Sequence, residues 1–129
     1  MVAGAGERIA AAVLGWPGVE ARPHRFGGRE YRWRGRELGH VHGDELADLP
    51  FPVRVRDQLV AQGQAAPHHI LPQTGWVSRW LRSPADVDTA IALFRLQYER
   101  WAGPPSAGDV PAGDQPGTSA PGAGDGPFR

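Results

Sequence analysis

The fold of this chain is decided by residues 20–49, which read EARPHRFGGREYRWRGRELGHVHGDELADL. Apolar and polar residues alternate with a period of two along this stretch, and glycines interrupt it at positions 27 and 28, at 35 and at 43. Alternation is typical of strands that bury one face, and glycines supply the tight turns between antiparallel strands. The stretch therefore predicts three or four antiparallel strands.

The segment REYRWR indicates which face of this sheet is buried. Tyr31 and Trp33 fall on one face and Glu30 and Arg32 on the other, because successive side chains of a strand point to opposite sides. We expect the aromatic face to look inward.

Helical patterns flank the predicted sheet. Residues 6–16 predict a short opening helix, residues 50–63 a second helix, and residues 76–80 one more strand. The last helix is the clearest, because Ser83 is a good N-cap and Pro84 suits the first helical position. Its apolar stripe repeats at spacings of three and four and consists of Val87, Ile91, Phe94, Tyr98 and Trp101. This order of elements predicts an α+β fold, with helices packed on one face of an antiparallel sheet of four to five strands.

Length and composition limit the class of protein. A chain of 129 residues suits a single domain. The segment 103–129 holds seven Gly and six Pro, so we predict a disordered tail after a domain of residues 1–102. The absence of cysteine excludes disulfides and thiolate chemistry, and a net charge of zero gives no general attraction to nucleic acid or to an anionic membrane. Since no apolar run reaches the ~20 residues that span a bilayer, we expect a cytoplasmic protein without a membrane partner.

The arginines raise the separate question of nucleic-acid binding. Residues 22–36 contain six Arg against one Glu, interleaved with aromatic residues. A stacking platform needs aromatic and basic side chains on one exposed face, whereas the period of two separates Trp33 from Arg32 and Arg34. We therefore expect a solvated arginine face and no nucleic-acid partner.

Histidines supply the candidate site. If residues 38–44 are extended, four side chains share one face of the strand: Leu38, His40, His42 and Asp44. His68 and His69 lie in a loop between prolines, which can fold back over the sheet. Three interpretations stay open: half-buried structural histidines, a catalytic group in which one imidazole is a general base, and a Zn or non-haem Fe site.

Residues 38–52 and 66–100 together resemble the small luciferase-like domain family, which includes the luciferase of fungal bioluminescence. The resemblance rests on the order and spacing of His40, His42, His68, Trp76 and a terminal helix that ends in Tyr98. It implies oxidation of a small molecule by molecular oxygen without an organic cofactor. It also implies that His40, His42 and His68 are the matching active-site positions.

Two functional hypotheses follow. In the first, a pocket accepts a small aromatic or enolic molecule, and His40, His42 or His68 removes a proton, so that the anion reacts with oxygen without cofactor or metal. The residues expected to bind this substrate are Tyr31, Trp33, Asp44, His69 and Trp76. In the second, a non-catalytic module binds a small molecule or a partner protein, and the histidines are structural. Neither hypothesis specifies an oligomeric state.

Overall fold

The computed structural model describes residues 1–103 and shows a six-stranded sheet with three α-helices. The strands are β1 (Val19–Pro23), β2 (Arg29–Trp33), β3 (Arg36–His42), β4 (Leu46–Pro50), β5 (Ala66–Pro67) and β6 (Trp76–Trp80). The helices are α1 (Ala5–Val13), α2 (Val53–Ala61) and α3 (Pro84–Ala102), with a 3₁₀ turn η1 (Arg25–Gly27) before β2. The predicted α+β class is confirmed, whereas the predicted tail, residues 103–129, lies outside the described residues from position 104 onward.

The strands are ordered β1-β2-β3-β4-β6-β5, and every neighbouring pair is antiparallel. Arg34 and Gly35 have φ angles of 50° and 82° and form the two-residue turn between β2 and β3, as hairpins with a primed turn require. The prediction of four to five strands omitted β5. That strand has only two residues, one of them Pro67, so it is too short to show an alternating pattern.

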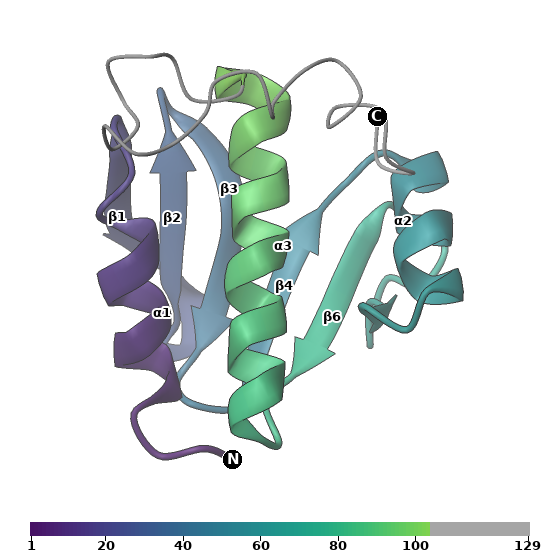
Figure 1. Ribbon diagram of the computed structural model, residues 1–129, viewed down its shortest axis with the longest axis horizontal. Coiled ribbons are helices and arrows are strands. Elements are labelled where there is room, and N and C mark those ends of the chain that lie inside the picture. Colours follow the sequence, from purple (N-terminus) through teal and green to yellow (C-terminus); the bar gives the residue numbers. More distant parts are fainter. Residues whose placement is uncertain (104–129) are drawn as a thin grey trace, which may run out of the picture.

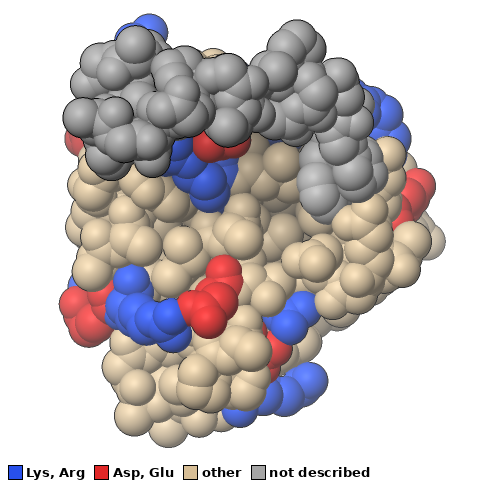
Figure 2. Space-filling view, viewed as in Figure 1, with Lys and Arg blue, Asp and Glu red and all other residues tan. Residues whose placement is uncertain are grey.

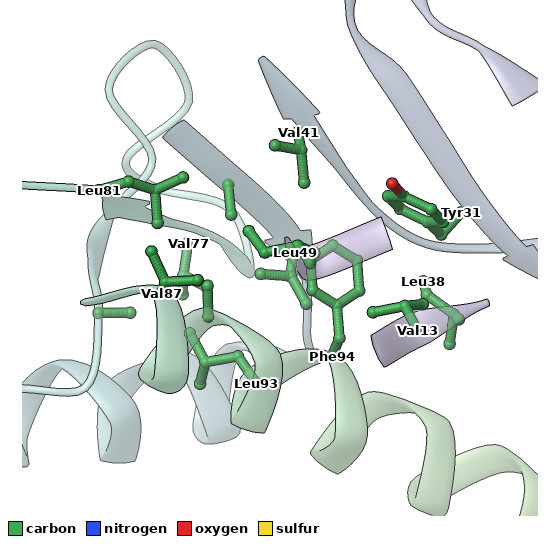
Figure 3. Packing of buried hydrophobic residues seen from close by; sticks show 14 of the residues in the cluster. Val13, Tyr31, Leu38, Val41, Leu49, Val77, Leu81, Val87, Leu93 and Phe94 are labelled. Carbon is green, nitrogen blue, oxygen red and sulfur yellow. The ribbon is translucent and has the colours of Figure 1, made fainter. Parts of the chain in front are cut away.

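The helices cover one face of the sheet. Figure 1 shows α1 and α3 side by side in front of it, with α2 beside β6. Figure 3 shows the apolar core between these layers, where Phe94 of α3 approaches Leu49 and Tyr31 of the sheet. The rings of Tyr31 and Phe94 meet edge to face with centroids 5.6 Å apart. Val55 and Leu59 of α2 join the same cluster, so the core is continuous across the three helices.

Helix α3 begins where the sequence predicts. The Ser83 side chain accepts a hydrogen bond from the Asp86 backbone N–H at 3.3 Å, and Pro84 occupies the first turn. Near the other end of the helix, the Tyr98 hydroxyl donates to the Pro17 carbonyl at 2.8 Å. These contacts hold α3 across the sheet and against the segment that follows α1.

A β-bulge in β3 changes the predicted facing of its side chains. Tyr31 pairs with Gly39 and Arg32 with Glu37, so Leu38 is the extra residue. An extra residue interrupts strand alternation. Leu38 consequently lies in the core under the helices, while His40 lies on the opposite side of the sheet, here called the outer face. The prediction that Leu38 shares a face with the histidines is wrong for this reason.

The helix-covered side carries charges of both signs. Figure 2 shows Arg and Asp or Glu side chains in small mixed groups on that side. One such pair joins α1 to α3 through Arg8 and Asp88. In the described part of the chain, none of the helices combines the length and apolar content that crossing a bilayer requires.

Candidate active site

Asp48 of β4 is the centre of a polar cluster on the outer face. Its side chain is buried (1 % exposed), and its Oδ1 accepts a 2.6 Å hydrogen bond from the Ser78 hydroxyl. Its Oδ2 accepts no hydrogen bond, yet three imidazole Nε2 atoms lie near it: those of His42 at 3.3 Å, His40 at 3.4 Å and His68 at 3.5 Å. A buried carboxylate oxygen that makes no hydrogen bond is costly, so Asp48 is the feature that a functional account must explain.

Strand pairing brings these groups together. In the β3–β4 hairpin His40 pairs with Asp48, and on the other side of β4 Asp48 pairs with Ser78 of β6. His68 directly follows β5, and its backbone N–H donates to the Trp76 carbonyl at 3.2 Å. The β5–β6 connection therefore starts beside Asp48, and its first side chain closes the cluster.

His40 is held between two carboxylates. Its Nδ1 lies 2.7 Å from a Glu37 oxygen, its Nε2 faces Asp48, and its ring stacks on His24 with centroids 3.8 Å apart. Burial alone would lower the pKa of His40, but its interactions with Asp48 and Glu37 outweigh burial and raise that pKa to about 9. In the absence of another cation, His40 is therefore charged at neutral pH and is a poor proton acceptor.

His42 and His68 are neutral, because for these two residues the effect of burial on the pKa is larger than that of the nearby carboxylate. Burial lowers the pKa of both, and the attraction of Asp48 does not compensate. The Nδ1 atom of His68 accepts backbone N–H groups from Ile70 and Leu71 at 3.1 and 3.0 Å. Because that lone pair is used, the neutral ring of His68 carries its proton on Nε2, facing Asp48.

His69 has an accessible lone pair. Its Nδ1 lies 3.2 Å from the Ser78 hydroxyl oxygen. Ser78 gives its only proton to Asp48, so this oxygen accepts the Nδ1–H of His69 and leaves the lone pair on Nε2. The His69 side chain is 33 % exposed.

Two tryptophans adjoin the histidines, and a hollow that none of the histidines lines adjoins Trp80. The centroids of the Trp76 and His40 rings lie 5.3 Å apart, and those of the Trp80 and His69 rings lie 5.9 Å apart. An open hollow of about 290 Å³ lies beside Trp80 and is lined by Ser78 and Arg82 among others. Its size is just below the ~300–1,000 Å³ range of small-molecule sites.

A family comparison identifies the domain. Residues 35–97 match the model of the family described as Luciferase domain. This chain contains a luciferase-like domain. The matched segment includes Asp48, Ser78 and four of the clustered histidines, whereas His24 lies before it. No curated protein and no solved structure shows a match to the chain.

The luciferase-like domain brings together five of the residues that the sequence singled out, namely His40, His42, His68, His69 and Trp76. It separates Tyr31 and Trp33 from them. Tyr31 packs on Phe94 in the core and Trp33 packs on Tyr98, both on the helix side of the sheet. The prediction that Tyr31 and Trp33 wall a pocket with Trp76 is wrong, because the sheet lies between them.

Asp44 also lies away from the cluster. Its carboxylate accepts the backbone N–H groups of Gly4 at 3.2 Å and Gly6 at 2.8 Å, at the start of α1. A negative charge at this end of a helix is stabilising. Asp44 and Tyr31 line a second hollow of about 130 Å³, to which none of the histidines contributes. The structure thus gives Asp44 a capping contact with α1.

Four residues of the site were missed from the sequence: Asp48, Ser78, Glu37 and His24. Asp48 could have been found, because the three-residue turn 43–45 pairs His42 with Leu46 and therefore His40 with Asp48. Ser78 had a weaker signal, namely its central place in the predicted strand at 76–80. The stacking of His24 depends on how the segment around η1 returns to the sheet, for which the sequence has no signal.

Proposed function

We propose that the luciferase-like domain oxidises a small aromatic or enolic molecule with molecular oxygen, and that the cluster around Asp48 is its active site. The observation that carries this proposal is the chain of contacts from Asp48 through Ser78 to His69. This chain orients an exposed imidazole beside a hollow, with its free lone pair on Nε2. The family match supports chemistry of this class.

The first step is removal of an acidic proton. His69 takes the proton of a phenol or enol on Nε2, and Asp48, acting through Ser78, stabilises the imidazolium that forms. The pKa of Asp48 supports this role: burial would raise it, but His40 and Ser78 together lower it, so the carboxylate is ionised. We assign this step to His69 because His40 is already protonated, His68 presents an N–H group, and Nε2 of His42 faces the buried Oδ2 of Asp48.

The hollow suits the anion that results. A flat ring fits against Trp80, and the Arg82 guanidinium, 5.6 Å from the centre of the Trp80 ring, offers a positive charge to the anion. The anion then transfers one electron to oxygen, and the superoxide and substrate radical so formed combine into a peroxide. His69 returns its proton to this peroxide, so no organic cofactor is required.

The test is oxygen consumption by the full chain with a panel of pyrones and phenols. We expect His69→Ala to lower kcat by about 10²–10⁴-fold, the usual contribution of a general base. Asp44→Ala is the matched control, because Asp44 lies at the start of α1, away from the cluster. Turnover that His69→Ala leaves unchanged would exclude the assignment. A compound that raises Tm without being consumed would support the alternative, a non-catalytic binding module.

A further inference from the structure

The Oδ2 atom of Asp48 makes no hydrogen bond and lies among imidazole nitrogens. Oδ2 is buried, accepts no hydrogen bond, and faces the Nε2 atoms of His40 and His42. Glu37 adds a second carboxylate at the other edge of the His40 ring. Two neutralisable imidazoles and one carboxylate around one point form a ligand set that divalent transition metals favour.

The spacing of the three atoms fits a shared ion. A tetrahedral metal that holds its ligands at ~2.0–2.1 Å keeps neighbouring ligand atoms ~3.3–3.4 Å apart. The Nε2 atoms of His40 and His42 lie 3.4 and 3.3 Å from Oδ2 of Asp48. One potential ligand atom of each residue lies within 4.8 Å of those of the other two.

Hydrogen bonding separates these ligands from the neighbouring histidines. Asp48, His68 and His69 also lie close together, but the Nδ1 atom of His68 accepts two backbone N–H groups, which puts a proton on its Nε2. His69 turns its Nδ1–H to Ser78. A third group is formed by His24, Glu37 and His40, but Glu37 and Nδ1 of His40 are 2.7 Å apart, which is a hydrogen-bond distance and shorter than the ~3.3–3.4 Å between the ligands of a tetrahedral ion.

The surroundings of His40 and His42 are those of a metal site. Glu37 contacts the Nδ1 atom of His40, and such a carboxylate typically orients a metal-binding imidazole and fixes its tautomer. The His42 side chain is 31 % exposed, which leaves one side of the site open to solvent and to a small ligand.

From this geometry we infer that His40, His42 and Asp48 bind one divalent transition-metal ion, of the Zn²⁺ or Fe²⁺ class, through two Nε2 atoms and Oδ2. Two histidines and one carboxylate are the three-ligand set of metal sites that keep open positions. Nε2 of His69 lies outside this set, so a bound ion and the proposed base can occupy the same site. The inference does not depend on the proposed reaction.

The test is calorimetric titration of the EDTA-treated full chain with ZnCl₂, with circular dichroism to check the fold of each variant. We expect one Zn²⁺ per chain. His42→Ala weakens binding by more than about 100-fold, because it removes a ligand, whereas Glu37→Gln weakens binding by about 10–100-fold, because it only releases the His40 ring. If His42→Ala fails to fold, His42→Gln replaces it. Titration with Co²⁺ adds a visible spectrum that reports the ligand set.

His69→Ala and His68→Gln are the matched controls, and both should bind Zn²⁺ like the parent chain. Absence of Zn²⁺ binding, or equal losses in His42→Ala and His69→Ala, would overturn the inference. A loss in His68→Gln as large as in His42→Ala would overturn the three-residue set. The proposed oxidation is tested separately, since His69→Ala should lower kcat by about 10²–10⁴-fold while Zn²⁺ remains bound.

Discussion

The stability of the metal-free protein should fall as the pH rises from 6.5 to 9.5. The pKa of His40 is about 9 in the fold, against 6.5 for a free imidazole, because Asp48 and Glu37 hold its charged form. A pKa raised by folding gives a stabilisation that is complete below pH 6.5 and is lost as the pH passes 9. One proton accounts for about 1.4 kcal/mol per pH unit, so the total loss is about 3 kcal/mol.

Lysine and cysteine side chains do not contribute to the pH dependence of stability in this range. The chain has no cysteine, whose thiol usually titrates near pH ~8.5, and no lysine, whose ammonium group usually titrates near pH ~10.4. Burial lowers the pKa of His42 and His68, which moves their titration toward acid. Urea unfolding, followed by tryptophan fluorescence in EDTA at intervals across this range, measures the free energy of unfolding directly.

His40→Gln is the control for this prediction. It cannot take up the proton, so its free energy of unfolding should stay nearly constant across the same range, whatever its absolute value. A flat profile in the parent chain, or an equal fall in His40→Gln, would refute the placement of His40 between two ionised carboxylates.

Three further substitutions test the fold around the site. Phe94→Ala removes a fully buried ring and should lower the free energy of unfolding in urea by about 3–5 kcal/mol; a loss under about 1 kcal/mol would contradict the packing. Gly39→Ala should cost about 1–3 kcal/mol in the same assay, because its Cβ would meet the Asp48 carbonyl oxygen at 2.7 Å; an unchanged midpoint would count against the bulge. Asp44→Ala should cost about 1 kcal/mol by thermal unfolding without changing turnover, whereas lost turnover would place Asp44 in the active site.

Much of the fold follows from local patterns. Helix α3 is predictable because Ser83 and Pro84 fix its start and its apolar stripe fixes its buried face. The strands are predictable because one face of the sheet is covered by helices, so that apolar and polar residues alternate along each strand. Gly35 and Gly43, which have positive φ angles, mark the turns between them. The gathering of histidines was foreseen as well, from the pair at 40 and 42 and the loop that carries His68.

The rest depends on contacts between distant strands. The bulge at Leu38 appears only when β2 is paired with β3, and it decides which side chains join the histidines. Without this bulge, Tyr31 and Trp33 would lie on the same face of the sheet as His40. The local sequence therefore predicts them on the wrong side of the site. Asp48 was overlooked because a single acid between apolar neighbours resembles a surface residue until β4 is placed between β3 and β6.

Crystals grown with one equivalent of Zn²⁺ test the central claim most directly. In an anomalous difference map at the zinc edge, we expect one peak on the outer face, about 2.0–2.1 Å from Nε2 of His40, Nε2 of His42 and one oxygen of Asp48. His68 and His69 should lie outside that shell. No peak at Asp48, or a peak bound by His68 and His69 instead, would contradict the account.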